Sequence, residues 1–453
     1  MNFNRRDILL NTLPFLAGAG VVGAVSPVAG AAPIKAMALA GTTVQSFGLS
    51  PHNTKDQTAA LQAAIDEAAK TAQVLSLPAG VFKTGPLTLR SGLVMSGVGP
   101  QSKLSFLGGA ALLQGEGLSN VRLSNMSIDG AARPLNNDRG GLISLKSVTG
   151  LMIDHITLKD GLTNGILLQG CSGQIIHSEF SELGNAAIFS DDATGLEIAY
   201  CHVHHCANNG ILVWRGEKGD DGTLVVHNRI NDISAKAGGS GQNGNGVNVF
   251  RAGGVIVSGN QIRDCAFSAI RNNSGDNVQI LNNSCHQLGE VAIYSEFSFE
   301  GAVIANNLVD GAHVGISITN FNEGGRLATA TGNLLRNLKK RKGVAAIGLA
   351  VEADSIVTGN CIEAVEGLGI GIGYGAYMRE VSANNNIIRG ADIGIGVSTH
   401  NDAGYALIAT NMITGTKNGG IRAMDKDKPL GPDLTKSSTE AFRNLAVYGN
   451  VSF

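Results

Sequence analysis

Residues 260–283, NQIRDCAFSAIRNNSGDNVQILNN, and residues 283–307, NSCHQLGEVAIYSEFSFEGAVIANN, are two consecutive copies of one pattern. Each copy contains an alanine followed by isoleucine, at Ala269-Ile270 and Ala292-Ile293, and each ends on an asparagine. Short segments rich in valine and isoleucine alternate with polar turns, which is typical of strands. A repeat of just over twenty residues predicts that each copy forms one coil of a solenoid.

The same two elements recur through most of the chain. A small residue followed by isoleucine or valine recurs at spacings of 22–26 residues in eight of ten steps, and the two longer spacings, 36 and 31 residues, predict loops. These pairs are Gly165-Ile166, Ala187-Ile188, Gly210-Ile211, Gly246-Val247, Ala269-Ile270, Ala292-Ile293, Gly315-Ile316, Ala346-Ile347, Gly369-Ile370, Gly394-Ile395 and Gly420-Ile421. Leucine-rich repeats have a similar period, but they need a regular leucine skeleton that this chain lacks.

The second element is a repeated asparagine. It occurs at Asn228, Asn260, Asn283, Asn307, Asn333, Asn360, Asn386, Asn411 and Asn450. We expect these side chains to form a ladder inside or at a turn, with each amide hydrogen-bonding the next coil. That role is structural, so the asparagines are not candidates for catalysis.

The composition agrees with many short strands joined by tight turns. Glycine accounts for 62 of 453 residues, whereas aromatic residues make up only 5% and charged residues only 15%. The formal net charge is −2 and there is no basic block, which weighs against nucleic acid as a partner. Six cysteines, none of them in a CxxC motif, are expected to be free buried thiols rather than zinc ligands or disulfides.

Residues 1–31 have the features of an export signal. Arg5 and Arg6 precede an apolar stretch over residues 8–25, and Ala29-Gly30-Ala31 is a small-x-small cleavage candidate. The segment resembles a bacterial twin-arginine signal, which implies a periplasmic or secreted protein. No later segment is long and apolar enough to span a bilayer, so we expect no membrane span after signal removal.

An N-terminal cap is predicted between the signal and the repeats. Residues 57–71 carry apolar side chains at helical spacing, and short segments punctuated by proline and glycine follow up to Gly99. The order FG, DQTAALQAAID, LPAGVFKTGPLTL and GVG over residues 46–100 resembles the pectate-lyase-like, rhamnogalacturonase/epimerase-type superfamily. This resemblance and the repeats predict an all-β, right-handed, single-stranded parallel β-helix with a short N-terminal capping helix. Residues 41–110 would form the cap and first coils, and residues 111–453 the repeats.

Strand geometry predicts two columns of outward-facing side chains. Side chains alternate along a strand, so residues one and three positions after the inward isoleucine point outward. The first column is Leu167, Phe189, Leu212, Asn248, Arg271, Tyr294 and Ser317. The second column is Gln169, Asp191, Trp214, Phe250, Asn273, Glu296 and Thr319.

The aromatic and charged residues in the middle coils of these columns predict a binding groove. The early and late coils show no such concentration. Two loops, residues 215–223 and 235–244, are expected to flank it, and loops on a rigid scaffold often carry function. Aromatic side chains would stack on sugar rings, and arginines would pair with uronate carboxylates. The predicted substrate-binding residues are Asp191, Trp214, Arg215, Phe250, Arg251, Asn273 and Glu296.

The chemistry that we expect is β-elimination or C5 epimerisation of a uronate. An enzyme of this kind neutralises the carboxylate and removes the adjacent proton, and elimination also needs an acid for the leaving oxygen. Arg271 is the expected carboxylate neutraliser or base, and Tyr294 on the adjacent coil is the base or acid. Asn248 would polarise the carboxyl group, and His205, in the expected turn before Gly210, is an alternative base.

Hydrolysis is an alternative chemistry. Asp191 and Glu296 are four coils apart, about 19 Å, which is too far for the paired carboxyl groups of a glycosidase. Asp191 and Asp192 resemble only a fragment of the polygalacturonase aspartate set, and the His-Gly and Arg-x-Lys signatures are missing. No cofactor is required, although Asp191, Asp192 or residues 220–221 could bind Ca²⁺.

Three functions therefore remain open from the sequence. The first is a lyase or epimerase that acts on an acidic polysaccharide. The second is a non-catalytic polysaccharide-binding protein of the cell envelope, and the third is a structural β-helix whose outer face contacts other proteins. The sequence leaves the sugar and the oligomeric state undetermined.

Overall fold

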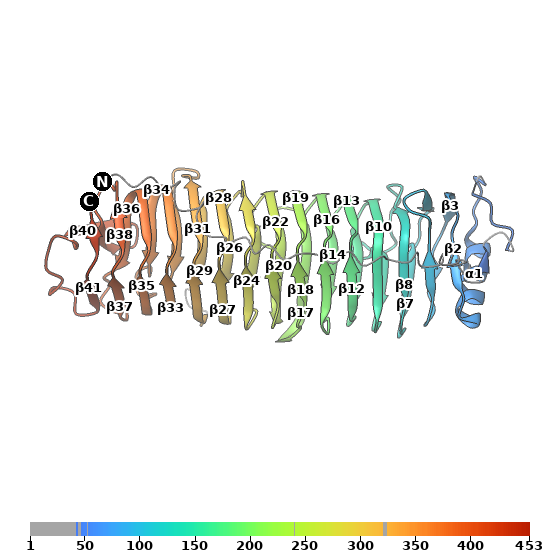
Figure 1. Ribbon diagram of the computed structural model, residues 1–453, viewed down its shortest axis with the longest axis horizontal. Coiled ribbons are helices and arrows are strands. Elements are labelled where there is room, and N and C mark those ends of the chain that lie inside the picture. The colour runs from blue at the N-terminus through green and yellow to red at the C-terminus, as the bar shows by residue number, and fades with distance from the viewer. Residues whose placement is uncertain (1–41, 44–46, 52, 240, 320–323) are drawn as a thin grey trace, which may run out of the picture. The chain divides into compact units, whose positions relative to one another are not determined.

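The computed structural model describes residues 42–43, 47–51, 53–239, 241–319 and 324–453. The predicted export signal, residues 1–31, lies outside these ranges. The described residues form one compact unit, a parallel β-helix of about 14 turns with one short helix near its start. Figure 1 shows the coils following one another in chain order from α1 to β40. The predicted fold class is confirmed.

The coils contribute strands to three stacks, which are parallel except for one antiparallel pair at the end of the third stack. The first stack contains β1 (Thr42–Thr43), β2 (Val74–Ser76), β5 (Val94–Ser96), β8 (Arg122–Asp129), β10 (Leu151–Gly161), β12 (Gly173–Ile176), β15 (Leu196–Ala199), β18 (Leu224–Val226), β21 (Ile256–Ser258), β24 (Val278–Leu281), β27 (Glu300–Ala305), β30 (Arg326–Thr331), β33 (Ala353–Thr358), β35 (Arg379–Asn384), β37 (Ala406–Ala409) and β41 (Leu445–Tyr448).

The second stack shares the long strands β8 and β10 with the first. Its other strands are β3 (Gly80–Thr84), β6 (Ser102–Phe106), β13 (Glu179–Leu183), β16 (His202–Cys206), β19 (Arg229–Ile233), β22 (Gln261–Cys265), β25 (Ser284–His286), β28 (Leu308–Ala312), β31 (Leu334–Leu338), β34 (Cys361–Ile372), β36 (Ile387–Ser398), β38 (Met412–Thr414) and β42 (Val451–Ser452).

The third stack shares β34 and β36 with the second and carries the predicted site. Its other strands are β4 (Leu87–Thr88), β7 (Leu113–Glu116), β9 (Gly141–Lys146), β11 (Asn164–Gln169), β14 (Ala186–Asp191), β17 (Asn209–Asp220), β20 (Asn245–Gly253), β23 (Ile270–Asn273), β26 (Val291–Glu296), β29 (Val314–Thr319), β32 (Ala346–Val351), β39 (Ile421–Asp425) and β40 (Lys428–Asp433).

The core consists of apolar side chains from all three stacks. Side chains at equivalent positions of consecutive coils lie next to one another along the solenoid. Ile166, Ile188 and Ile211 are fully buried and occupy the same position in consecutive coils. A Cβ added to Gly210 would lie 2.4 Å from the carbonyl oxygen of Gly246, which explains why only a small residue precedes the isoleucine here.

One predicted pair is displaced. The position equivalent to Ile316 in the next coil is Leu349, not Ile347. Leu349 is fully buried, whereas Ile347 is partly exposed. The connection between β31 and β32 changes the spacing of the repeated pair. Gly348-Leu349 therefore takes the position predicted for Ala346-Ile347.

The asparagine ladder is confirmed along its full predicted length. In a typical step, the Asn283 side-chain amide donates to Asn307 Oδ1 at 3.0 Å and to the Val257 carbonyl oxygen at 2.9 Å. The backbone N–H of Asn283 also donates to Asn307 Oδ1, at 2.9 Å. The same pattern links every ladder member to the next, from Asn228 to Asn450. Buried polar groups are thus satisfied by repetition of one residue.

The capping helix is also confirmed, as α1 (Thr58–Thr71). Its buried residues include Leu61, Ile65 and Ala68, which join the main hydrophobic core. The helix lies at the N-terminal end of the coil stack in Figure 1, where it covers the apolar end of the first coils. No helix within the described ranges is long and apolar enough to cross a membrane.

Two expectations about connections and cysteines need correction. After β39 the chain folds back on itself, because β40 pairs antiparallel with β39, and Asp433 accepts hydrogen bonds from the backbone N–H groups of Gly420 and Ile421. Residues 215–220 belong to β17, which bulges after Trp214 and resumes pairing at Gly219. All six cysteines are free, but Cys361 is exposed while the other five are buried.

Candidate functional site

The two predicted columns are in register on the third stack. Strand pairing aligns Leu167 with Phe189, and so on to Arg271, Tyr294 and Ser317. The same pairings align Gln169, Asp191 and their successors up to Thr319. We call the part of these columns from Phe189 to Glu296, on β14, β17, β20, β23 and β26, the Trp214 face.

The centre of the Trp214 face is buried, although the sequence predicts an open surface. Asn248, Arg271 and Glu296 are only 4%, 8% and 4% exposed. The connection between β19 and β20 lies against Arg271, since a Cβ added to Gly241 would lie 2.0 Å from Arg271 Nη1. The predicted loop 235–244 therefore flanks the columns and also covers part of them.

Arg271 and Glu296 form a buried ion pair. Arg271 Nε and Nη2 lie 2.6 and 2.5 Å from Glu296 Oε1, and Asn273 Nδ2 donates to the same oxygen at 3.0 Å. Burial raises the pKa of Glu296, although the Arg271 charge and these hydrogen bonds oppose the rise. Arg271 therefore already has a carboxylate partner within the chain, so it is not poised to neutralise a substrate carboxylate.

Tyr294 lies beside this ion pair. The Arg271 guanidinium carbon is 5.0 Å from the centre of the Tyr294 ring. Burial raises the pKa of Tyr294, and the nearby Glu296 charge adds to the rise. A raised phenol pKa makes Tyr294 a poorer base at neutral pH, and its protonated form is suited to donate a proton.

The aromatic side chains of the Trp214 face form a row. The ring centres of Phe189 and Trp214 are 5.2 Å apart, and those of Trp214 and Phe250 are 5.5 Å apart. All three side chains are partly exposed. Arg251 lies over the Phe250 ring, with 4.8 Å from its guanidinium carbon to the ring centre. The row thus combines exposed ring surface with an adjacent positive charge.

The bulge of β17 follows Trp214 and is held by contacts to other coils. Arg251 Nη1 donates to the Gly216 carbonyl oxygen at 2.7 Å, and Lys218 Nζ lies 2.8 Å from Asp276 Oδ1. Arg215 Nη2 is 3.8 Å from Asp192 Oδ1. These contacts tie the bulge to the preceding and following coils, so Arg215 and Arg251 are held beside the aromatic row.

Buried polar atoms without a protein partner gather in this region. Within the described ranges, seven of eight such side-chain atoms lie between residues 190 and 271. They are Ser190 Oγ, Trp214 Nε1, Arg215 Nε, Asp221 Oδ2, Asn245 Oδ1, Ser268 Oγ and Arg271 Nη1. Most buried polar groups in proteins are hydrogen-bonded, and two of these unpartnered atoms, Trp214 Nε1 and Arg271 Nη1, belong to the Trp214 face.

The early coils of the third stack carry a polar hollow that the sequence does not predict. A hollow of about 340 Å³ lies on β7, β9 and β11, lined by Gln114, Glu116, Lys146 and Gln169 among others. Gln169 is the register neighbour of Asp191 at the start of the Trp214 face. Extending the two columns by two coils toward the N-terminus would have found this hollow from the sequence.

His205 is not part of the Trp214 face. It lies in β16, a strand of the second stack, rather than in a turn before Gly210. It borders a different hollow of about 750 Å³, together with Glu182, Asp232 and Lys236. His205, the expected alternative base, therefore lies on a different stack of strands from Arg271 and Tyr294.

The carboxylates proposed for Ca²⁺ form no compact ligand set. Asp192 Oδ1 accepts a hydrogen bond from the Gly216 N–H at 3.1 Å, and Asp221 Oδ1 binds the Thr223 hydroxyl. Burial, and then the Asp192 charge, raise the pKa of Asp191. In the part of the chain that the structure describes, three-residue groups with converging ligand atoms occur only at Asp154/His155/His177 and Glu179/His202/His204.

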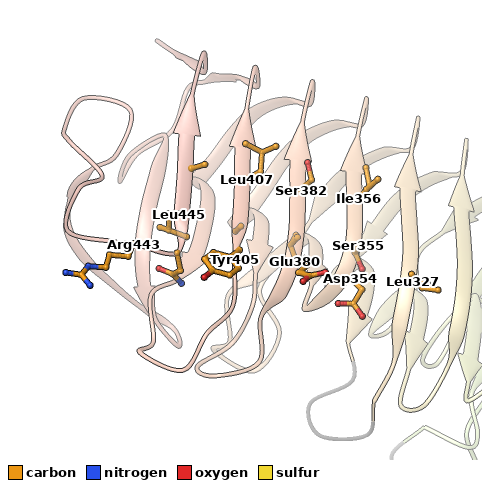
Figure 2. Close-up of a pocket in the computed structure, with 14 residues that line it drawn as sticks. Leu327, Asp354, Ser355, Ile356, Glu380, Ser382, Tyr405, Leu407, Arg443 and Leu445 are labelled. Carbon is orange, nitrogen blue, oxygen red and sulfur yellow. The ribbon is translucent and has the colours of Figure 1, made fainter.

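A further hollow, of about 540 Å³, lies on the outer face of the first stack (Figure 2). Tyr405, Leu327 and Ile356 contribute exposed apolar surface to it. Two hydrogen bonds of 2.8 Å join Arg379 to Asp354, and they hold the pKa of Asp354 below its ordinary range. The hollow also contains Glu380 and Arg443, so acidic and basic groups are mixed in it.

Comparisons with known proteins agree with this architecture. The family model described as "Right handed beta helix region" matches residues 102–230 and 164–335, which together cover more than half of the chain. The chain therefore belongs to the right-handed β-helix family. A search of curated protein sequences gives no match.

Solved structures with a similar fold come from several kinds of protein. Pre-mature bacteriophage phi29 gene product 12 has a TM-score of 0.52 and 15% identity, over 84% of this chain and 55% of that one. The chain thus spans little more than half of the phage protein. The A-module of a mannuronan C-5 epimerase from Azotobacter vinelandii has a TM-score of 0.47 and 14% identity, over 91% of this chain and 99% of that one. At these identities the likeness shows the fold alone.

Proposed function

We propose that the Trp214 face binds an acidic polysaccharide, and that the protein does so in the periplasm or outside the cell after export. The observation that carries this proposal is the row Phe189, Trp214 and Phe250 with arginines fixed beside it. Exposed aromatic rings offer flat apolar surface to sugar rings. Arg215 and Arg251 offer planar donors to uronate carboxylates, and a guanidinium suits that geometry better than an ammonium group.

The register of the third stack supports a chain-like ligand. Successive coils are about 4.8 Å apart, so the row presents one ring on each of three consecutive coils, at β14, β17 and β20. The hollow at Lys146 and Gln169 extends this surface toward the N-terminus. A polymer that runs along the stack could therefore contact both regions at once, which favours a polysaccharide over a single small sugar.

Binding without catalysis is the better supported form of this function. Glu296 already pairs with the guanidinium of Arg271, both groups are buried, and the connection at Gly241 lies against Arg271. A lyase or epimerase would need Arg271 to face the substrate carboxylate. Separation rules out Asp191 and Glu296 as a hydrolytic pair, because they are four coils apart in the register, roughly 19 Å.

A lyase or C5-epimerase activity is the second candidate, and one observation favours it. Asn248, Arg271 and Tyr294 lie side by side in register, and Arg271 Nη1 has no protein acceptor. Displacement of the connection at Gly241 would let a uronate carboxylate meet this donor, with Tyr294 placed to donate a proton to the leaving oxygen.

The test is binding of polyuronates, such as alginate and polygalacturonate, by affinity electrophoresis. We expect Trp214→Ala and Phe250→Ala each to weaken binding by about tenfold, as loss of a stacking contact of about 1.4 kcal/mol implies. Tyr405→Ala is the matched control, since it removes an exposed aromatic ring from the hollow in Figure 2. Retained binding in both Trp214 and Phe250 variants, or loss in the Tyr405 variant alone, would contradict the proposal.

A turnover assay on the same polymers separates the two candidates. Ultraviolet absorbance reports unsaturated uronate ends, and proton exchange at C5 reports epimerisation. Turnover that disappears in Tyr294→Phe would establish the enzyme. Binding without turnover is the result that we expect.

A further inference from the structure

The histidines of this chain are concentrated on a few neighbouring coils, away from the Trp214 face. Six of the ten lie between residues 155 and 227. They are His155, His177, His202, His204, His205 and His227. Three of them, His202, His204 and His205, lie in the single strand β16 of the second stack. This concentration is not explained by the proposed polysaccharide site.

The spacing in β16 places two imidazoles on one face. His202 and His204 are two positions apart in a strand, so their side chains point to the same side. Glu179, in the adjacent strand β13, is the register partner of His202. Two histidines and one carboxylate thus meet on the outer surface of two neighbouring strands, each held by a continuous parallel ladder.

The ligand atoms of these three residues already converge. Glu179 Oε1 is 3.1 Å from His204 Nε2, and the rings of His202 and His204 have centres 4.4 Å apart. One ligand atom from each residue lies within 4.8 Å of the others. Two ligands on one tetrahedral zinc ion are about 3.3 Å apart, given metal–ligand distances near 2.0 Å. Small rotations of the exposed Glu179 and His202 side chains would complete the site.

A neighbouring histidine orients the most buried ligand. The His204 side chain is 18% exposed, and its Nδ1 atom lies 2.7 Å from His205 Nδ1. Its Nε2 atom faces Glu179. Metal-bound histidines commonly have their second nitrogen fixed by such a hydrogen bond. Asn231 Oδ1, on the next coil, is 3.0 Å from His202 Nε2 and holds that ring in place as well.

We propose that Glu179, His202 and His204 bind a divalent transition-metal ion of the zinc type. Nitrogen and carboxylate ligands in this combination suit zinc and its neighbours in the first transition series, whereas Ca²⁺ prefers oxygen ligands alone. Three protein ligands leave one coordination position open to water or to an anionic group.

The other converging group, Asp154, His155 and His177, is less suited to a cation. Asp154 Oδ1 lies 2.6 Å from His155 Nδ1 and 3.1 Å from His177 Nδ1, while Asp154 Oδ2 is 3.7 Å from Arg122 Nη2. The carboxylate already faces an arginine, so a metal ion would bring a second positive charge beside it. This group therefore provides a matched comparison.

The test is zinc and cobalt binding to the untagged protein, measured by isothermal titration calorimetry and by Co²⁺ absorption. We expect one site in the unaltered chain, and we expect His202→Ala and Glu179→Gln each to weaken Zn²⁺ binding by at least tenfold. The Co²⁺ spectrum should also lose its tetrahedral absorption bands in both variants. Asp154→Asn should leave both measurements unchanged.

Thermal unfolding without metal checks that the variants fold. Zn²⁺ should raise the melting temperature of the unaltered protein, and this rise should shrink in Glu179→Gln but not in Asp154→Asn. The proposal is overturned if Zn²⁺ does not bind, if Glu179→Gln and His202→Ala bind it normally, or if Asp154→Asn alone loses it. None of these results bears on polysaccharide binding at the Trp214 face.

Discussion

The asparagine ladder and the Trp214 face are built on the same coils but differ in every other respect. Along the ladder, each coil presents the same residue, and each amide bonds the next one with nearly constant distances of 2.9–3.0 Å. Across the Trp214 face, successive coils present different side chains, and two buried polar atoms, Trp214 Nε1 and Arg271 Nη1, have no protein partner.

This difference separates what holds the solenoid together from what it can do. Repetition lets each coil satisfy its neighbour, so a repeated residue needs no external ligand. A face where the repeat is broken leaves polar groups unsatisfied and exposes aromatic rings beside arginines. Variants that remove one element from each region test whether the two regions differ as we infer.

The largest expected effect on the free energy of unfolding comes from removing one partner of the buried ion pair on the Trp214 face. Glu296→Ala leaves the Arg271 guanidinium buried without a counter-charge, so the free energy of unfolding should fall by about 3–5 kcal/mol. Replacing both residues, Arg271→Met with Glu296→Leu, should restore much of this loss. Urea unfolding measures both, and a single-variant loss below about 1 kcal/mol would show that solvent reaches the pair.

A slightly smaller effect is expected from the ladder. Asn283→Ala removes the amide that bonds Asn307 and Val257, and it leaves the donors of Asn260 without their acceptor. Unsatisfied buried groups of this kind should lower the free energy of unfolding by about 3 kcal/mol.

The control for the ladder is the preceding residue, Asn282, which is exposed and has a positive φ of 56°. Asn282→Gly keeps that conformation accessible and should change stability by less than about 1 kcal/mol. Equal losses in the two variants would mean that the turn itself, rather than the ladder bonds, is the stabilising element.

The smallest effect concerns the pH dependence at Asp191. Burial and the Asp192 charge raise the pKa of Asp191 above its ordinary value of 3.8, so its ionised form disfavours the folded state. The contribution of Asp191 to stability is therefore lost as the pH rises through its raised pKa. Asp191→Asn should stabilise the protein at pH 7 by less than about 1 kcal/mol, because the group is partly exposed.

Unfolding of this variant at a series of pH values checks the sign. The difference between Asp191→Asn and the unaltered protein should shrink as the pH falls below about 4, where Asp191 is protonated in both the folded and unfolded states. A stabilisation that grows at low pH would contradict the raised pKa.

Much of the fold follows from the sequence because its signals are local and repeated. The spacing of the isoleucines predicts the length of one coil, and the repeated asparagines predict the turn that carries the ladder. The error at Ile347 arises where a longer connection interrupts the spacing, and only the strand pairing shows that Leu349 takes the position. The sequence places His205 in a turn because it comes shortly before Gly210, whereas the structure places it within β16 with a positive φ of 53°.

The site is less predictable because it depends on what covers it. Alternation along the strand correctly places Arg271 and Glu296 on the outward columns. It cannot show that the connection at Gly241 lies over Arg271, or that Arg271 and Glu296 pair with each other. The Glu179/His202/His204 group is not predicted because the columns are read only along the strands of the third stack, whereas its members lie on β13 and β16 of the second stack.

The most direct test of the account is the fluorescence of Trp214, which is the only tryptophan in the chain. Its emission therefore reports on the proposed polysaccharide site without interference from other tryptophans. Titration with a polyuronate should give a saturable change in emission that salt weakens, and a neutral dextran of similar length should give much less. Binding of polyuronate detected by calorimetry with no change in Trp214 emission would contradict the assignment of the site to this face.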